Sequence, residues 1–154
     1  MSSKRERYRE LLTGIRAMLD GEPDWVAAMA TVACEIHHAF DEFSWTGFYR
    51  AVSGDLLVVG PYQGAHGCIR IPFARGVCGA AASTLLTQLV PDVQAFPGHI
   101  ACSCTTRSEI VVPVIRPDGT LLAVLDVDSD RPATFDADDQ RYLEELCAEL
   151  GRRY

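Results

Sequence analysis

The sequence lacks a long hydrophobic run and an excess of basic residues. No apolar stretch approaches the roughly 18 residues of a membrane-spanning helix, and no signal-peptide core follows the basic start. Of the 154 residues, 21 are acidic and 14 are Lys or Arg, a formal charge of -7. A negative chain disfavours sequence-independent binding to nucleic acid or to an anionic membrane. These absences favour a small-molecule partner and a cytoplasmic location.

The sequence also lacks paired Cys-x-x-Cys ligands, internal repeats, low-complexity segments and linkers. Without a linker, we expect residues 1–154 to form a single domain, which is long enough to bury a core without disulfides or metal. The six cysteines should be mostly free thiols in a reducing compartment, and any disulfide should be transient. A zinc site made of Cys68, Cys102, Cys104 and His99 is a minor alternative, because their spacing does not match paired ligation.

Helical spacing of apolar residues marks three segments. The first runs from Arg5 to Leu19 and predicts an amphipathic helix. Asp24 is a candidate N-cap for a second helix, whose apolar stripe ends at Phe40. Asp136 is a candidate N-cap for a third, with Cys147 on its apolar face. The chain therefore has helices towards both ends.

Between these helices the pattern indicates strands. Segments 45–50 and 56–59 are joined by a predicted hairpin at 53–55, and 110–116 and 121–128 by a turn at 117–119. A short strand is expected at 68–72, after a loop at 60–64. Pro113 suggests a sheet edge or a bulge. We expect antiparallel pairing.

The loop and strand at 98–111 place a thiol close in sequence to a carboxylate. Cys102 lies in a polar loop rich in Gly, Ser and Thr, where a thiol can meet a small molecule. Glu109 opens an apolar strand, where desolvation raises the pKa of a carboxyl group and makes it a candidate proton donor. Thiol and acid together suggest reduction of an oxidised substrate. The alternative is that Cys102 is a small buried hydrophobic residue.

Three other features are candidates for a site. Asp126 and Asp128 share one face of a strand, and such a like-charged pair needs a cation or a proton; further oxygen ligands for calcium are absent. Trp45 and Tyr49 point to the same side of a strand and form either an aromatic wall or part of the core. Cys78 at a helix start has either a lowered pKa or a packing role.

Seven short motifs occur together in an order typical of one enzyme family. They are WTGFY at 45–49, GPYQG at 60–64, CIRIP at 68–72, GVCG at 76–79, GHIAC at 98–102, SEIV at 108–111 and LDVDS at 125–129. On these motifs the chain resembles the free methionine-(R)-sulfoxide reductases. The resemblance implies an α+β, GAF-like single domain, with an antiparallel sheet of about six strands and the N- and C-terminal helices packed on it.

The resemblance also implies site residues and partners. Cys102 would be the nucleophile, Cys68 the resolving thiol and Cys78 an accessory thiol. The substrate-binding residues would be the carboxylates Glu109, Asp126 and Asp128, with Trp45 and Tyr49 lining a pocket for the methyl group. The substrate would be free methionine-(R)-sulfoxide, the reductant of thioredoxin type, and no cofactor or metal is implied. A homodimer is compatible with the resemblance, and the sequence does not decide the oligomeric state.

The expected chemistry explains these residue types. Cys102 would attack the sulfoxide sulfur while Glu109 protonates the departing oxygen, and the other carboxylates would suit the ammonium of a free amino acid. The resulting sulfenic acid would condense with a second thiol to give a disulfide. The alternative is a non-catalytic GAF sensory module that binds a small ligand.

The chain departs from the family pattern directly after Cys102. Ser103 and Cys104 stand where the family usually has Asp and a small residue. Cys104 is therefore an alternative resolving thiol. We expect Cys68 to keep that role, because a disulfide between residues two apart closes a small, strained ring.

Overall fold

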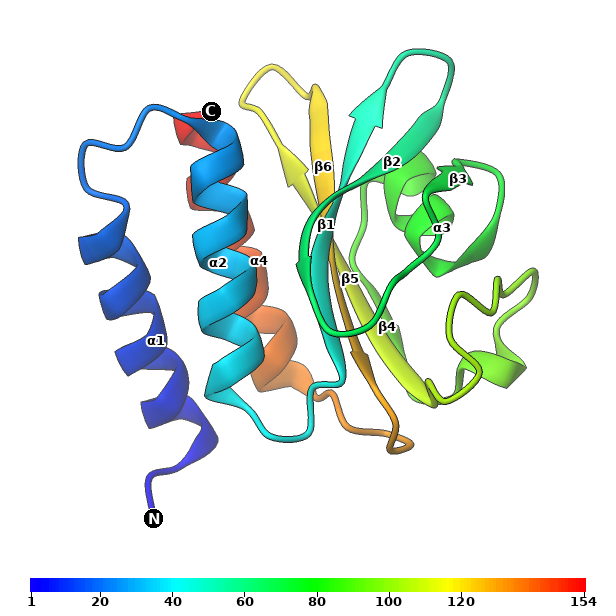
Figure 1. Cartoon of the computed structure of the whole chain (residues 1–154), viewed down its shortest axis with the longest axis horizontal. Helices are drawn as coiled ribbons and strands as arrows, with labels where there is room; N and C mark the ends of the chain where they lie inside the picture. Colours follow the sequence, from blue (N-terminus) through cyan, green and yellow to red (C-terminus); the bar gives the residue numbers. More distant parts are fainter.

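The computed structural model describes all residues 1–154 and is built around one antiparallel sheet (Figure 1). Its six strands lie in the order β3-β2-β1-β6-β5-β4. Their bounds are β1 Trp45–Val52, β2 Leu56–Gln63, β3 Arg70–Pro72, β4 Gln88–Val90, β5 Ser108–Ile115 and β6 Leu121–Ser129. Every pair of neighbouring strands is antiparallel, which confirms the α+β prediction.

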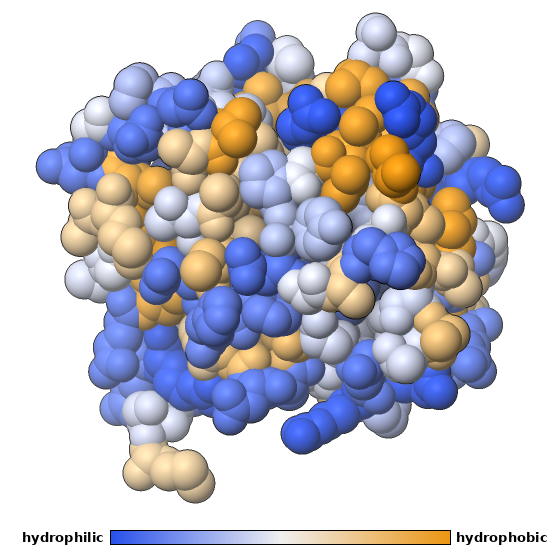
Figure 2. All heavy atoms as spheres, in the orientation of Figure 1, coloured by the Kyte–Doolittle hydropathy of each residue, from blue (hydrophilic) through white to orange (hydrophobic).

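The helices cover the two faces of the sheet unequally (Figure 1). α2 (Trp25–Ala39) and α4 (Ala137–Arg153) lie on one face, with α1 (Lys4–Met18) outside them. α3 (Gly76–Thr84) lies on the other face with the long loops, and a single 3-10 turn, η1, spans Val93–Ala95. None of these helices combines the length and the apolar character needed to cross a membrane. Figure 2 shows hydrophilic residues surrounding separate hydrophobic patches on one side of the molecule.

The predicted helix caps are present. Asp24 accepts a hydrogen bond from the backbone N–H of Ala27, and Asp136 accepts from the N–H of Asp139 in a capping box. Both caps satisfy N–H groups that a helix start would otherwise leave unpaired. Met18, an apolar residue of the predicted amphipathic helix 5–19, is not buried and is 49% exposed.

Beneath α1, α2 and α4 lies a core of 25 buried residues with one buried charge network. Asp139, which is 0% exposed, accepts hydrogen bonds from the Tyr8 hydroxyl at 2.6 Å and the Lys4 ammonium at 2.7 Å. The backbone N–H of Asp136 donates to the same carboxylate at 2.8 Å. This network links α1 to α4.

The sheet differs from the sequence prediction in three places. β2 continues through residues 60–63, which were expected to form a loop. Gly60 and Pro61 together lie opposite Phe48 in a β-bulge, and this bulge lets the pairing of β1 with β2 continue beyond Pro61. The three-residue strand β4 was not predicted. Cys68 lies in the loop before β3, which begins only at Arg70, and not in a strand as expected.

Pro113 lies in β5 beyond the end of its short neighbour. β4 pairs only with 109–111, so β5 has an open edge at Pro113. A proline can occupy such an edge because its missing N–H breaks no ladder bond there. The expectation of an edge position is confirmed.

Candidate active site

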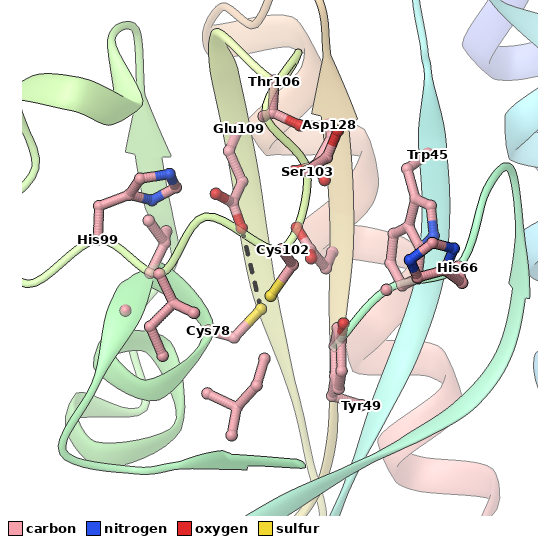
Figure 3. Close-up of a pocket in the computed structure, with 16 residues that line it drawn as sticks. Trp45, Tyr49, His66, Cys78, His99, Cys102, Ser103, Thr106, Glu109 and Asp128 are labelled. Carbon is pink, nitrogen blue, oxygen red and sulfur yellow. Dashed lines mark hydrogen bonds between the residues drawn. The ribbon is translucent and has the colours of Figure 1, made fainter. Parts of the chain in front are cut away.

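One cavity of about 40 Å³ lies between the sheet, the start of α3 and the loop that carries Cys102 (Figure 3). It is lined by every predicted site residue except Cys68, which is bonded to one of them. Two of its lining residues, His66 and Ser103, are solvent-exposed. The candidate residues from distant parts of the chain therefore meet at one place.

Three carboxylates enter this cavity from β5 and β6. Glu109 pairs directly with Asp128 across the two strands, and Asp126 lies two residues earlier on the same face. Burial raises the pKa of Glu109, as predicted. Burial and the nearby carboxylates raise the pKa values of Asp126 and Asp128 well above their ordinary value. The site thus holds carboxyl groups that ionise less readily than exposed ones.

Two of these carboxylates are incompletely paired. Asp126 is only 5% exposed, and its Oδ1 has no hydrogen-bond partner. The Oδ1 atom of Asp128 is likewise buried and unpartnered. A buried carboxylate oxygen without a donor is costly, so these two atoms favour either protonation of the carboxyl group or the entry of a donor or a cation.

Aromatic rings form one wall of the cavity. Trp45 and Tyr49 stack with centroids 5.7 Å apart, which confirms that they share a side of β1. Both residues are also buried in a second hydrophobic cluster of 12 residues, separate from the core of 25. The two interpretations, an aromatic wall and part of a core, therefore both hold. Tyr62 stacks behind Trp45 at 5.2 Å, and the Trp45 indole N–H donates to the Ala65 carbonyl at 2.8 Å. Tyr62 was not among the predicted site residues, although it lies in the GPYQG motif.

Gly47 makes this stacking possible. A Cβ atom at Gly47 would lie 2.4 Å from the Cβ of Tyr62 and 2.7 Å from the Trp45 ring. Any side chain there would displace one of the two aromatic residues. The close approach therefore requires glycine.

The thiols occupy distinct environments. Cys68 and Cys102 form a disulfide with a Cα–Cα distance of 5.2 Å, which is the pairing that the resemblance implied. It ties the loop before β3 to the loop before β5. Cys104 is free and exposed, while Cys147 is free and buried in the core, as predicted.

Cys78 is the third thiol of the site. It is 4% exposed and donates a long hydrogen bond to Glu109, with an S···O distance of 3.9 Å (Figure 3). Burial and the neighbouring carboxylates raise its thiol pKa well above the ordinary value. Of the two alternatives for Cys78, the lowered pKa is therefore wrong. Burial and the nearby negative charge outweigh the effect of the helix dipole on the thiol pKa.

Two histidines complete the lining. His99 has a buried Nδ1 with no partner, and desolvation lowers the pKa of its imidazole. His66 comes from the loop after β2. Neither was predicted to belong to the enzyme site, and His99 was considered only as a zinc ligand. His99 lies in the GHIAC motif, so the motif carried a signal, whereas His66 was found only from the tertiary structure.

The zinc alternative based on Cys68, Cys102, Cys104 and His99 is not supported. Two of its four ligands are joined in a disulfide and a third is exposed. Atoms of types that can ligate a metal lie instead at Cys78, Glu109 and Asp126, all within 4.8 Å of one another.

Comparison with known proteins identifies the family. Residues 21–152 match the GAF domain model. The free methionine-R-sulfoxide reductases of Saccharomyces cerevisiae and Escherichia coli are 43% and 37% identical to the chain; the alignments cover 97% of it and 87% and 90% of the relatives. The X-ray structure of free methionine-R-sulfoxide reductase from Neisseria meningitidis in complex with its substrate has a TM-score of 0.94 and 47% identity, covering 99% of this chain and 91% of that one. On this identity and coverage, the chain belongs to the free methionine-R-sulfoxide reductase family, and its α+β fold is the GAF fold.

Proposed function

We propose that this protein reduces free methionine-(R)-sulfoxide to methionine by thiol chemistry. The observation that carries the proposal is the joining of Cys102 to Cys68 at a cavity lined by three carboxylates, of which those of Glu109 and Asp126 are buried. The reaction needs two groups, a reducing thiol and a general acid whose pKa is raised.

The cavity suits the substrate at both ends. The aromatic pair Trp45 and Tyr49 offers an apolar surface to the methyl group on sulfur. The unpartnered Oδ1 atoms of Asp126 and Asp128 offer acceptors to the α-ammonium. A methionine sulfoxide residue within a peptide lacks that ammonium, so the carboxylates would remain unpaired and binding would be weak.

In the proposed reaction, Cys102 attacks the sulfoxide sulfur as a thiolate. The attack forms a transient S–S bond while Glu109 donates its proton to the sulfoxide oxygen. The resulting hydroxyl group passes to the Cys102 sulfur as the S–O bond and the S–S bond break, so methionine leaves, Cys102 becomes a sulfenic acid and Glu109 becomes a carboxylate. The Cys68 thiol then displaces the hydroxyl group as water and forms the Cys68–Cys102 disulfide. A dithiol reductant of thioredoxin type opens this disulfide by exchange, so electrons balance without a cofactor.

We further propose that residues 1–154 act as one domain in a reducing compartment such as the cytoplasm. The family match begins at residue 21, yet Tyr8, Leu12 and Ile15 of α1 belong to the same core as α2 and α4. The segment before the match therefore contributes to the domain. A cytoplasmic location would supply the dithiol reductant.

The test is reduction of free methionine sulfoxide with dithiothreitol, following each epimer by chiral separation. We expect loss of the R epimer only, and little reduction of its N-acetylated form. Cys102→Ser is the control and should be inactive. Equal rates on the free and N-acetylated substrates would contradict the role of Asp126 and Asp128, and saturable binding without turnover would favour the sensory-module alternative.

A further inference from the structure

The cluster of Cys78, Glu109 and Asp126 has a ligand geometry that the proposed reaction does not explain. One thiol sulfur and two carboxylate oxygens lie within 4.8 Å of one another, and all three residues are buried. They come from α3, β5 and β6, so packing of three elements holds them together. Figure 3 shows Cys78 pointing from α3 towards Glu109.

The distances fit a tetrahedral zinc ion. Bonds of about 2.3 Å to sulfur and about 2.0 Å to oxygen at the tetrahedral angle place the two ligand atoms about 3.5 Å apart. Cys78 Sγ and Glu109 Oε1 are 3.9 Å apart, so a small side-chain movement closes the difference. The cavity of about 40 Å³ leaves room for a water molecule as fourth ligand.

The unpartnered carboxylate oxygens that suit the substrate ammonium also suit a metal cation. Asp126 is 5% exposed, and its Oδ1 has no hydrogen-bond partner. The buried Oδ1 of Asp128 is also unpartnered. Positive charge entering the cavity would satisfy both atoms, and the Cys78 sulfur selects against magnesium and calcium, which prefer oxygen ligands.

We propose that Cys78, Glu109 and Asp126 bind a thiophilic divalent cation, represented by Zn²⁺, in competition with substrate. The ion would take the place of the substrate ammonium near Asp126 and engage the carboxyl group of Glu109. This is an inhibitory site and not a cofactor site. Only the competition with substrate rests on the proposed function; binding of the ion does not.

The binding test uses the disulfide form of the full chain, in which Cys68 and Cys102 cannot ligate. Zn²⁺ is titrated against a chromophoric chelator in the absence of reductant. We expect one ion per chain, with affinity weakened about tenfold or more in Cys78→Ser and in Asp126→Asn. Excess Mg²⁺ should not displace it.

The matched control is Cys34→Ser on α2. Cys34 Sγ lies 3.7 Å from His38 Nδ1, so this pair is the surface site where zinc would bind adventitiously. Affinity should be unchanged in this variant. Loss of affinity in Cys34→Ser with none in Cys78→Ser, or no binding by the unmodified chain, would overturn the proposal.

The second measurement is steady-state turnover of free methionine sulfoxide with a non-chelating reductant. Added Zn²⁺ should raise the apparent KM at least tenfold and leave kcat unchanged, as expected for competition with the substrate. A fall in kcat at constant KM would overturn the competitive placement. Absence of turnover together with Cys78-dependent zinc binding would refute the proposed function and leave the cation site standing, so the two failures are distinguishable.

Discussion

The two faces of the sheet each bury an aspartate, and the two residues differ in how completely they are paired. On the helical face, Asp139 is 0% exposed and accepts from Tyr8, Lys4 and the backbone of Asp136. On the face covered by α3, Asp126 is 5% exposed and leaves Oδ1 without a donor. Burial alone therefore does not distinguish the carboxylate of the core from the one proposed to bind substrate, whereas the missing hydrogen-bond partner does.

This difference in pairing also predicts how each carboxylate affects the free energy of unfolding. A buried charge with a full set of donors stabilises the fold only while every partner is present. A buried carboxylate beside other carboxylates opposes folding until a ligand arrives. Substitution of Asp139 should accordingly lower the free energy of unfolding and leave activity unchanged, whereas substitution of Glu109 should lower activity without lowering the free energy of unfolding.

The largest effect is expected for the thiols of the cavity face. Cys68→Ser should stop thioredoxin-coupled cycling, because the Cys102 sulfenic acid would lose its partner. Cys104→Ser should cycle normally. Peptide mapping by mass spectrometry after one turnover without reductant should find a Cys68–Cys102 link. A dominant Cys102–Cys104 link would show that the resolving role has moved.

Glu109→Gln should come next in size. The amide keeps the shape but cannot donate the proton, so kcat should fall by about 10²–10⁴-fold, the usual contribution of general acid catalysis. The free energy of unfolding should not decrease, because the substitution removes a buried acid from a repulsive cluster. Turnover within twofold of the unmodified protein would exclude Glu109 as the acid.

Asp139→Asn should show the reverse pattern. Loss of the charge opposite Lys4 and of the capping carboxylate should lower the free energy of unfolding by about 2–3 kcal/mol, measured by urea denaturation. kcat per folded molecule should be unchanged, because Asp139 lies on the face away from the cavity. Tyr8→Phe is the matched control, with a smaller loss of about 1 kcal/mol. A selective fall in kcat would break the comparison.

Asp126→Asn should have the smallest effect on stability, in the favourable direction. A carboxyl whose pKa is raised on folding contributes stability that is present below its ordinary pKa of 3.8 and is lost as pH rises towards the raised value. Asn does not ionise, so at pH 8 the variant should have a higher Tm. A gain of about 1 kcal/mol corresponds to about 2–4 °C in a domain of this size. The gain should shrink towards pH 4; a lower Tm at pH 8 would contradict it.

Much of the fold could be predicted from local patterns. The caps Asp24 and Asp136 and the apolar stripes located the helices, because both signals depend on neighbouring residues. The three-residue strand β4 could not be predicted, since its sequence carries too few positions for a period and its pairing with β5 is tertiary. The bulge that extends β2 past Pro61 likewise depends on the facing strand.

The site was predictable by residue type but not by environment. The motifs supplied Cys102, Glu109 and the two strand aspartates. The high pKa of Cys78 results first from burial and then from carboxylates more than 30 positions away in the chain, so its helix position alone predicted the wrong direction. His66 reaches the cavity from a loop, and Tyr62 stacks on Trp45 from a bulged strand; the sequence specifies neither path.

Gly47 has a consequence for how this family can vary. Its contribution to the site is empty space, because the positions of Trp45 and Tyr62 depend on there being no side chain between them. In a library of random substitutions selected for activity, position 47 should therefore tolerate as little change as the reacting cysteine. A survey that counts only atoms in contact with a ligand would overlook it.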